Sequence, residues 1–248
     1  MIGRWIFLRG GRLAARTKLI LAGLFLLALI VMFPLRIALG LIDPGAHGVT
    51  ARAVEGTIWS GRIGELRAGP LPLGTVEAGM QPLPLLIGRG EIWLRRPAAN
   101  GAAPFSANAT GGEDWLRLSE VDGTVPLADG LGQLPVTTLG FSGFSYSAEA
   151  GRCKAAEGTV SLTLASLTPL LPNDVVFGGK ARCDRGALYV PMTGPTGMEK
   201  LFVRLEANGT WRADLTLGGL PVEVTTPLLE QGFTGRSGGI GLSAAGKL

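Results

Sequence analysis

Histidine and cysteine are scarce in this sequence of 248 residues, which holds one His and two Cys. Counts this low exclude the Cys₄, Cys₂His₂ and His₃ sets that bind most structural and catalytic zinc ions. The one histidine, His47, lies in a Gly-Ala-His-Gly segment beside a long apolar stretch, where we expect a solvated turn. We therefore predict that the protein has no metal site.

Sequence motifs of the common enzyme classes are also missing. No Gly-x-Gly-x-x-Gly follows a predicted strand, and no phosphate-binding loop ends in Gly-Lys-Ser/Thr. Gly140-Phe141-Ser142-Gly143 lacks the second spaced glycine of a nucleophile elbow, and His47 precedes Ser142, which reverses the chain order of such hydrolases. We predict no catalytic residue, no cofactor and no enzyme activity.

Charged residues are few, at 17% of the chain, although the hydrophobic fraction of 46% is sufficient for a folded core. The first 42 residues contain six Arg or Lys and no acidic residue. The rest of the chain has 17 basic and 19 acidic residues. A domain with that balance lacks the basic surface that nucleic acid requires, so we predict no nucleic-acid partner.

An apolar stretch follows the basic N-terminus. No polar side chain occurs from Leu19 to Phe33, and Arg36 is the one charge between there and Ile42. At ~1.5 Å per residue, a helix over residues 19–42 is long enough to cross a bilayer. The positive-inside rule then places residues 1–18 in the cytoplasm and an exported domain at residues 45–248. The residues that determine this topology are Arg4, Arg9, Arg12, Arg16 and Lys18.

A cleaved signal peptide is the alternative interpretation of this segment. Ala38-Leu39-Gly40 offers small residues at the spacing that a signal peptidase accepts. The 18-residue basic segment and the length of the apolar stretch favour an uncleaved anchor. Both interpretations export the same domain.

The exported domain shows strand periodicity. Apolar and polar residues alternate over residues 160–164, 201–206 and 211–218, which predicts half-buried antiparallel strands. Three short Gly-containing segments between such stretches predict hairpins: Ala207-Asn208-Gly209, Asp184-Arg185-Gly186 and Glu149-Ala150-Gly151. We therefore predict a mainly β, antiparallel domain, with a possible division into two parts near residue 135.

Helical turns are expected to be short. Thr226 to Gly232 combines a Thr cap, Pro227 at the first helical position and a terminal Gly, which predicts one or two turns. An acid or amide followed by Gly-Thr recurs at four places, where we expect a turn leading into a strand. These places are Glu55-Gly56-Thr57, Asp122-Gly123-Thr124, Glu157-Gly158-Thr159 and Asn208-Gly209-Thr210.

Cys153 and Cys183 both fall in predicted strands of the exported domain. Because cysteine pairs in oxidising compartments usually close, we expect a disulfide between them. It would close a loop of about 31 residues and contribute on the order of 3.5 kcal/mol on the chain-entropy estimate. The two residues are not a Cys-x-x-Cys pair, which argues against a redox role.

Two regions resemble the type II secretion system protein N family. The first comprises Val54-Glu55-Gly56-Thr57-Ile58-Trp59-Ser60-Gly61-Arg62 and the later Pro82-Leu83-Pro84-Leu85-Leu86-Ile87-Gly88-Arg89-Gly90. The second comprises Cys153, Gly158-Thr159-Val160, Gly178, Cys183 and Gly186-Ala187-Leu188. The resemblance covers nearly the whole chain, and its motifs are residues that shape a fold and perform no reaction.

The resemblance implies a single-pass protein of the cell inner membrane with a β-rich periplasmic domain. It would be a non-enzymatic accessory subunit of the Gram-negative machine that moves folded proteins from the periplasm across the outer membrane. Other inner-membrane subunits are the implied partners, with the secretin as a further candidate. An alternative resemblance is to AsmA-like envelope proteins, which would bind or transfer lipid along a β-groove.

Gly56, Thr57, Trp59, Ser60 and Gly61 form the most distinctive part of the motif. Trp59 has two interpretations, a core residue that caps the sheet or an exposed anchor for a partner. The flanking glycines look like bend positions that aim the indole, and this favours the structural interpretation.

Overall fold

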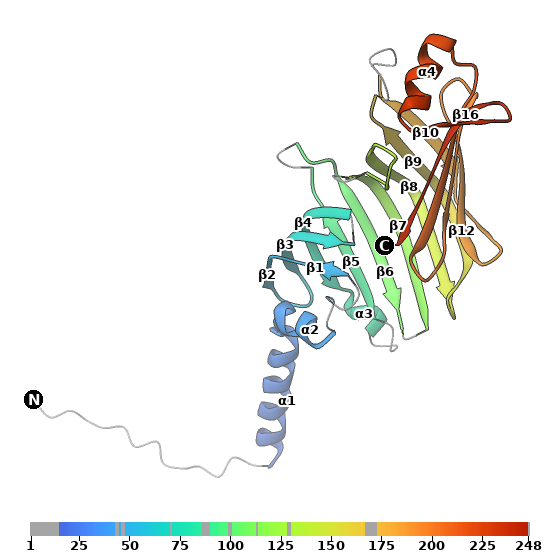
Figure 1. The fold of residues 1–248 in the computed structure, drawn as a ribbon. Helices are drawn as coiled ribbons and strands as arrows, with labels where there is room; N and C mark the ends of the chain where they lie inside the picture. The colour runs from blue at the N-terminus through green and yellow to red at the C-terminus, as the bar shows by residue number, and fades with distance from the viewer. Residues whose placement is uncertain are drawn as a thin grey trace, which may run out of the picture.

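The structure, a computed structural model, describes residues 15–42, 45, 48–69, 71–85, 90–98, 101–112, 114–127, 130–166 and 173–247. A helix leads into one broad antiparallel sheet, whose C-terminal half curls and carries a short helix at its top (Figure 1). The predicted mainly β, antiparallel fold with short helical turns is thereby confirmed.

The sheet has 16 strands, and all its neighbouring strands are antiparallel in the order β1-β3-β4-β5-β6-β7-β8-β9-β10-β12-β13-β14-β16-β15, with β2 on β3 and β11 on β12. The first eight are β1 Val49–Thr50, β2 Ala53–Gly56, β3 Gly61–Ala68, β4 Leu71–Met80, β5 Glu91–Arg96, β6 Phe105–Gly111, β7 Trp115–Pro126 and β8 Val136–Glu149. The others are β9 Arg152–Leu164, β10 Val175–Lys180, β11 Arg182–Asp184, β12 Ala187–Thr193, β13 Glu199–Leu205, β14 Thr210–Leu217, β15 Thr234–Arg236 and β16 Gly239–Lys247. The helices are α1 Ala15–Val31, α2 Leu35–Ile42, α3 Pro82–Leu85 and α4 Val222–Glu230.

The N-terminal apolar stretch forms two helices, α1 and α2, separated by Met32 to Pro34. The expectation that residues 37–42 extend one helix is therefore wrong. Proline has no backbone N–H, and its ring disfavours a helical residue before it, so α1 ends ahead of Pro34. Among the residues that the structure describes, no helix combines the length and apolar character needed to cross a membrane.

The three predicted hairpins are confirmed. Residues 206–209 join β13 to β14, Arg185-Gly186 joins β11 to β12, and Ala150-Gly151 joins β8 to β9. Ala150 and Gly151 both have positive φ, at 47° and 67°, which is the backbone of a type I′ turn. Such turns match the twist of the two strands that they connect.

The four Gly-Thr sites serve different purposes. At Gly56 the predicted turn into a strand is wrong, because β2 ends at Gly56 and β3 begins only at Gly61. At Gly209 the predicted turn into a strand is confirmed, since β14 begins at Thr210. At Gly123 and Gly158 this interpretation is wrong, because both lie inside long strands where the pairing register shifts. Gly158 has φ 93°, and a Cβ there would lie 2.4 Å from the Gly143 carbonyl oxygen. At both shifts two residues of β8 lie opposite one residue of the neighbouring strand, Asp122 of β7 or Gly158 of β9. These are β-bulges in β8, which bend the sheet.

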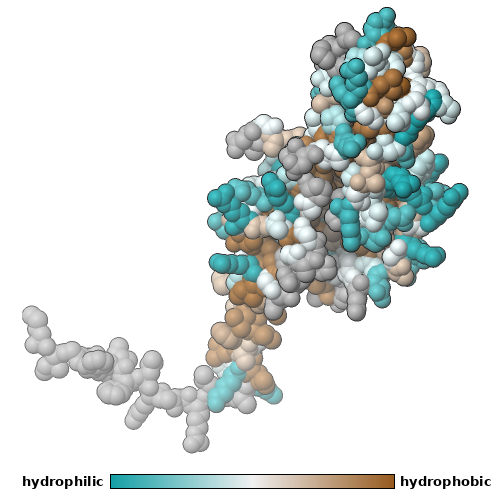
Figure 2. All heavy atoms as spheres, in the orientation of Figure 1, coloured by the Kyte–Doolittle hydropathy of each residue, from teal (hydrophilic) through white to brown (hydrophobic). Residues whose placement is uncertain are grey.

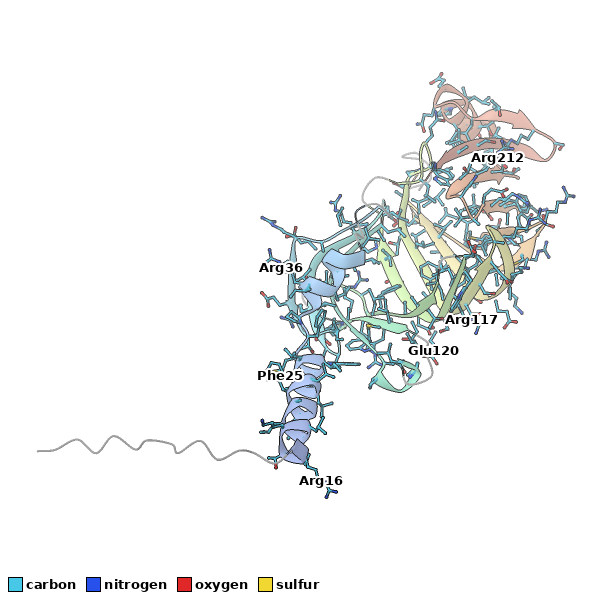
Figure 3. All side chains as sticks on the ribbon, turned by 90° about the horizontal axis from the view of Figure 1, so that it is seen from below. Arg16, Phe25, Arg36, Arg117, Glu120 and Arg212 are labelled. Carbon is cyan, nitrogen blue, oxygen red and sulfur yellow. A yellow bond between two sulfur atoms is a disulfide. The ribbon has the colours of Figure 1, made fainter. Side chains whose placement is uncertain are left out.

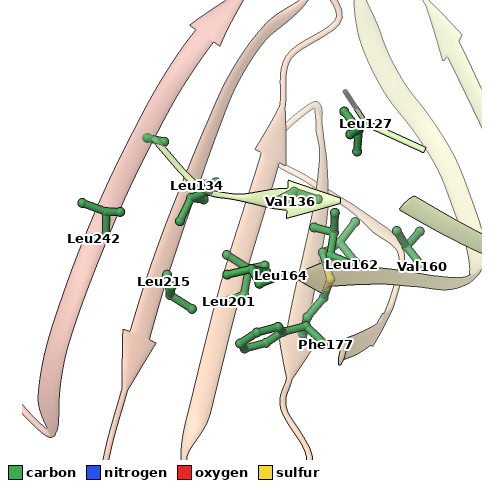
Figure 4. Packing of buried hydrophobic residues seen from close by; sticks show 14 of the residues in the cluster. Leu127, Leu134, Val136, Val160, Leu162, Leu164, Phe177, Leu201, Leu215 and Leu242 are labelled. Carbon is green, nitrogen blue, oxygen red and sulfur yellow. The ribbon is translucent and has the colours of Figure 1, made fainter. Parts of the chain in front are cut away.

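The main core lies inside the curl of the C-terminal half. The segment between β7 and β8 crosses the concave face of β9 to β16 and carries Leu134, whose side chain is 1% exposed. Figure 4 shows Leu134 close to Leu215 and Leu242, with Val136 above Leu162 and Leu164. A second, smaller core joins α2 to β3 and β4 through Leu35, Ile63, Leu66, Val76 and Ala78.

Division of the domain near residue 135 stays a prediction. β7 and β8, on either side of that position, pair along their length, so the sheet is continuous there.

Helix α4 closes one end of the main core. It begins at Val222, four residues before the predicted Thr226 cap, and Pro227 lies inside it. The predicted start is therefore wrong. Thr226 instead donates its hydroxyl to the Val222 carbonyl at 3.1 Å. Leu228, fully buried against the core, places the helix, and tertiary packing thus outweighs the local capping pattern.

We predict that Leu134→Ala lowers the free energy of unfolding by about 3 kcal/mol, because it leaves a cavity beneath β14 and β16. Urea unfolding followed by tryptophan fluorescence measures this. The control, Leu229→Ala, removes the same atoms from a side chain that is 44% exposed, and should change stability by less than about 0.5 kcal/mol. Equal losses in the two variants would contradict the packing described for Leu134.

Candidate functional site

The candidate site is the place where the two helices meet the sheet, which we call the helix–sheet junction. It consists of residues 30–35, between and at the ends of α1 and α2, and residues 56–61, the turn between β2 and β3. The Ile58 N–H donates to the Phe33 carbonyl at 3.0 Å, and Pro34 forms an antiparallel bridge with Thr57. The interhelical segment thus joins the sheet through its main chain.

Trp59 joins the turn to α1. Its indole N–H donates to the Ile30 carbonyl at 3.0 Å. In a continuous helix this carbonyl would accept from the N–H of residue 34, which Pro34 does not have. The Phe33 N–H approaches the same oxygen at 3.4 Å, a long contact. The indole therefore supplies the donor that the proline removes.

Glycines on either side of the turn allow this close approach. Gly61 lies so near α2 that a Cβ there would be 2.5 Å from Leu35 Cδ2. Gly56 has φ 90°, which few other residues adopt, and lets the chain turn. The Thr57 N–H donates to the Ser60 carbonyl at 3.1 Å and closes the turn. All five predicted motif residues therefore meet at this one place.

The junction also reaches the next strand of the sheet. The Met80 N–H at the end of β4 donates to the Ile58 carbonyl at 2.7 Å. Leu35, 7% exposed, inserts from α2 into the small core beside Ile63 and Val76. The printed contacts of the junction are hydrogen bonds and apolar packing, which hold α1, α2 and the sheet in a defined relative position.

The remaining predicted residues lie elsewhere. Cys153 of β9 and Cys183 of β11 form a disulfide, with their Cα atoms 5.6 Å apart. Arg16 and Lys18 are exposed on the first turn of α1. Figure 3 shows Arg16 at the end of the helix that lies far from the sheet. Arg4, Arg9, Arg12 and His47 lie outside the described residues. The segment at residues 82–90 forms the single turn α3 up to Leu85, and residues 86–89 are also outside the description.

Arg96 is a buried cation that the sequence reasoning missed. Its guanidinium donates to three backbone carbonyls, those of Ala103 at 2.9 Å, Leu73 at 2.8 Å and Thr124. Burial lowers the pKa of this group. Strand alternation could have indicated that one of Arg95 and Arg96 faces inward, but not that its partners would be carbonyls on other strands.

A surface hollow of about 340 Å³ lies beside Arg96, between β4, β5, β6 and β7. Its lining includes Glu77, Arg95 and Asp122. Asp122 already accepts the Gly143 N–H at 2.7 Å, and the Arg96 donors are taken by carbonyls. Among the described residues, no group of three His, Cys, Asp or Glu is placed to hold a metal ion.

We predict that Trp59→Phe loosens the helix–sheet junction, because it removes the hydrogen bond to Ile30 at a cost of about 1 kcal/mol. The exchange rate of the Ile58 amide hydrogen, which donates to Phe33, should rise about fivefold. Hydrogen–deuterium exchange of the full chain in detergent measures this. Trp115→Phe is the matched control, since that side chain is 43% exposed at the start of β7.

A second background tests the role of the proline. Pro34→Ala restores an N–H that can donate to Ile30, so Trp59→Phe should have a smaller effect on Ile58 exchange in that background. If Trp59→Phe raises the exchange rate equally with Pro34 and with Ala at this position, the indole does not replace the missing donor.

Comparison with known proteins gives one family. The sequence model of the family described as "Type II secretion system (T2SS), protein N" matches residues 47–240, which is well over half of the chain. The matched region contains the turn of the junction, the disulfide and the sheet as far as β16. No curated protein and no solved structure gives a match. The chain therefore belongs to the type II secretion system protein N family.

Proposed function

We propose that the protein is a non-enzymatic accessory subunit of the type II secretion system, anchored in the cell inner membrane with its sheet in the periplasm. Family membership ties the chain to this system and carries the proposal. The motif residues of the junction contact helix and sheet through hydrogen bonds of the Trp59 indole and of the main chain. A subunit that acts by contacting partners needs its sheet held in a fixed position, and these contacts provide that.

The surface of α1 supports the membrane anchor. Every side chain from Arg16 to Val31 is exposed, and most are large and apolar, including Leu19 at 72% and Phe25 at 67%. Figure 2 shows this apolar surface on the helix below the sheet, whose own surface is mixed. A helix that is apolar all round needs an apolar surrounding, which a bilayer supplies. Arg16 and Lys18 stand at the end that the proposal places in the cytoplasm.

The partners follow from the family at a coarse level, since membership implies interaction with other components of the type II secretion system. We propose inner-membrane subunits as the direct partners and the periplasmic part of the secretin as a further one. The junction supports this arrangement, because it holds the sheet at a fixed place relative to the anchor.

Lipid binding along a β-groove has less support. A groove for an acyl chain would need free apolar surface on the concave face of the sheet. In the C-terminal half, Leu134 and Val136 cover the side chains of β9 to β16, and α4 adds Val224 and Leu228. A face packed in this way has no space for a lipid chain.

The accessory role predicts co-purification. After mild crosslinking in cells with an active system, the full chain, tagged at its N-terminus and extracted in detergent, should carry inner-membrane secretion subunits in about constant ratio. Quantitative mass spectrometry measures this, with an untagged strain as control. Isolation of the chain by itself, or in a stable complex with lipid, would refute the accessory role.

The orientation has its own test. Replacing Arg4, Arg9, Arg12, Arg16 and Lys18 by Gln should reduce the activity of alkaline phosphatase fused to the C-terminus, since this enzyme is active only outside the cytoplasm. The control replaces five exposed bases of the sheet, Arg67, Arg117, Arg152, Arg182 and Arg212, and should leave activity unchanged. Equal activity in the two variants would contradict the proposed role of the N-terminal bases.

A further inference from the structure

The two edges of the sheet differ in how well they are covered. At the N-terminal edge, β2 and β1 pair with β3, and the Pro34–Thr57 bridge and α2 lie beside β2. At the C-terminal edge, β15 covers β16 only from Gly239 to Gly241. No described strand lies on that side of β16 from residue 242 to 247 (Figure 1). One edge is closed and the other is half open.

The pairing register identifies the backbone groups at the open edge. The Glu206 N–H donates to the Thr210 carbonyl at 2.8 Å, so Thr210 directs its polar groups toward β13. In an antiparallel strand the direction alternates, and Trp211, Ala213 and Leu215 therefore face β16. Their partners on β16 are Gly246, Ala244 and Leu242. The intervening residues, Ser243, Ala245 and Lys247, direct N–H and C=O away from the sheet.

Contacts at β15 agree with this assignment. Gly241 belongs to the same alternating set, and its carbonyl accepts the Thr234 hydroxyl at 3.4 Å from the β15 side. Beyond Gly241, the described backbone hydrogen bonds outside the ladders include none at Ser243, Ala245 or Lys247. The backbone groups of β16 that face away from β14 are thus covered by β15 at Gly239 and Gly241. At Ser243, Ala245 and Lys247 the same groups have no partner among the described residues.

Natural proteins usually block such an edge with charged side chains, proline, a bulge or a covering segment. From Leu242 to Gly246, β16 has no charged residue, no proline and no register shift against β14. The exposed side chains of this stretch, Ser243 and Ala245, are small. Ser243 donates to Asp214, and Arg236 pairs with the same carboxylate at 3.6 Å, so the neighbouring charges are neutralised. Lys247, exposed at the end of this stretch, has no ion-pair partner among the described residues.

We propose that the open edge of β16 binds a β-strand from another secretion subunit, which pairs with the backbone of Ser243, Ala245 and Lys247. This inference rests on the proposed function and names the surface used. Strand addition gives affinity through main-chain hydrogen bonds and specificity through side chains. The exposed Lys247, which has no ion pair among the described residues, favours a partner strand with an acidic residue beside it.

Ala245 provides a sharp test. Ala245→Pro removes an N–H that the sheet itself does not use, so the fold should tolerate it as edge strands tolerate proline. Strand addition should not tolerate this substitution, because a hydrogen bond to the incoming strand is lost and the proline ring obstructs that strand. Ala245→Val is the matched control, since it keeps the N–H and suits a strand.

The measurement is photo-crosslinking with p-benzoylphenylalanine in place of Thr234, an exposed residue of β15 that pairs with Gly241 next to the open edge, in the full chain and in cells with an active secretion system. We expect a crosslink to one secretion subunit, identified by mass spectrometry of the joined peptides. Ala245→Pro should lower its yield about tenfold or more, and Ala245→Val should leave it within about twofold. Circular dichroism and the thermal midpoint of the purified variants establish that each is folded.

Each result decides between the proposals. An unchanged yield in a folded Ala245→Pro variant, or a crosslink to a second copy of this chain, overturns the strand-addition proposal. Either result leaves the accessory role intact if secretion subunits still co-purify with the wild type. Loss of co-purification in the wild type overturns the accessory role itself.

Discussion

The fold depends on how one antiparallel sheet of this width buries an apolar face. A flat sheet would leave that face in water, so the sheet must bend and cover itself. Bulges in β8, opposite Asp122 of β7 and Gly158 of β9, bend the long central strands. The segment that carries Leu134 then crosses the concave face and fills it. The buried core, the curvature of the sheet and the packing on its concave face thus all follow from the need to bury one apolar face.

A second constraint acts where the helices meet the sheet. Pro34 ends α1 and leaves the Ile30 carbonyl without its helical donor. The Trp59 indole supplies one from the turn between β2 and β3, and the main chain around Pro34 pairs with that turn. The helix is thereby joined to the sheet at a defined place. Under the proposed function, this contact determines where the sheet lies relative to the membrane anchor.

The proposed function relies on the surfaces of the molecule. In the hollow beside Arg96, the Arg96 guanidinium and the Asp122 carboxylate already bond to the backbone of the protein itself. The edges of the sheet differ, with short strands and α2 at one end and unpaired backbone of β16 at the other. This asymmetry suits a component that is attached to the membrane on one side and extended by a partner on the other.

Much of the local structure was predictable from the sequence. Alternating residues and Gly-containing turns identified the β fold and three hairpins, because both patterns depend on neighbouring residues. The family motif could be recognised because its residues, Gly56 to Gly61, are neighbours in the sequence. The start of α4, the break before α2, the bulges in β8, and the roles of Trp59 and Arg96 were not predicted. Pro34 was a local signal for the break, although the apolar stretch was predicted as one helix. Trp59 and Arg96 could not be read in this way, because their partners Ile30 and Thr124 lie 29 and 28 residues away and only packing brings them together.

The sequence by itself determined the class of the fold, the pairing of strands joined by tight turns, and the separation of an apolar, basic N-terminus from a nearly neutral domain. The tertiary structure decided which residues fill the concave face, which side chain replaces the donor missing at Pro34, and which edge stays open. Short-range order follows from backbone preferences and side-chain alternation. These other features depend on the curvature of the whole sheet, which no local pattern contains.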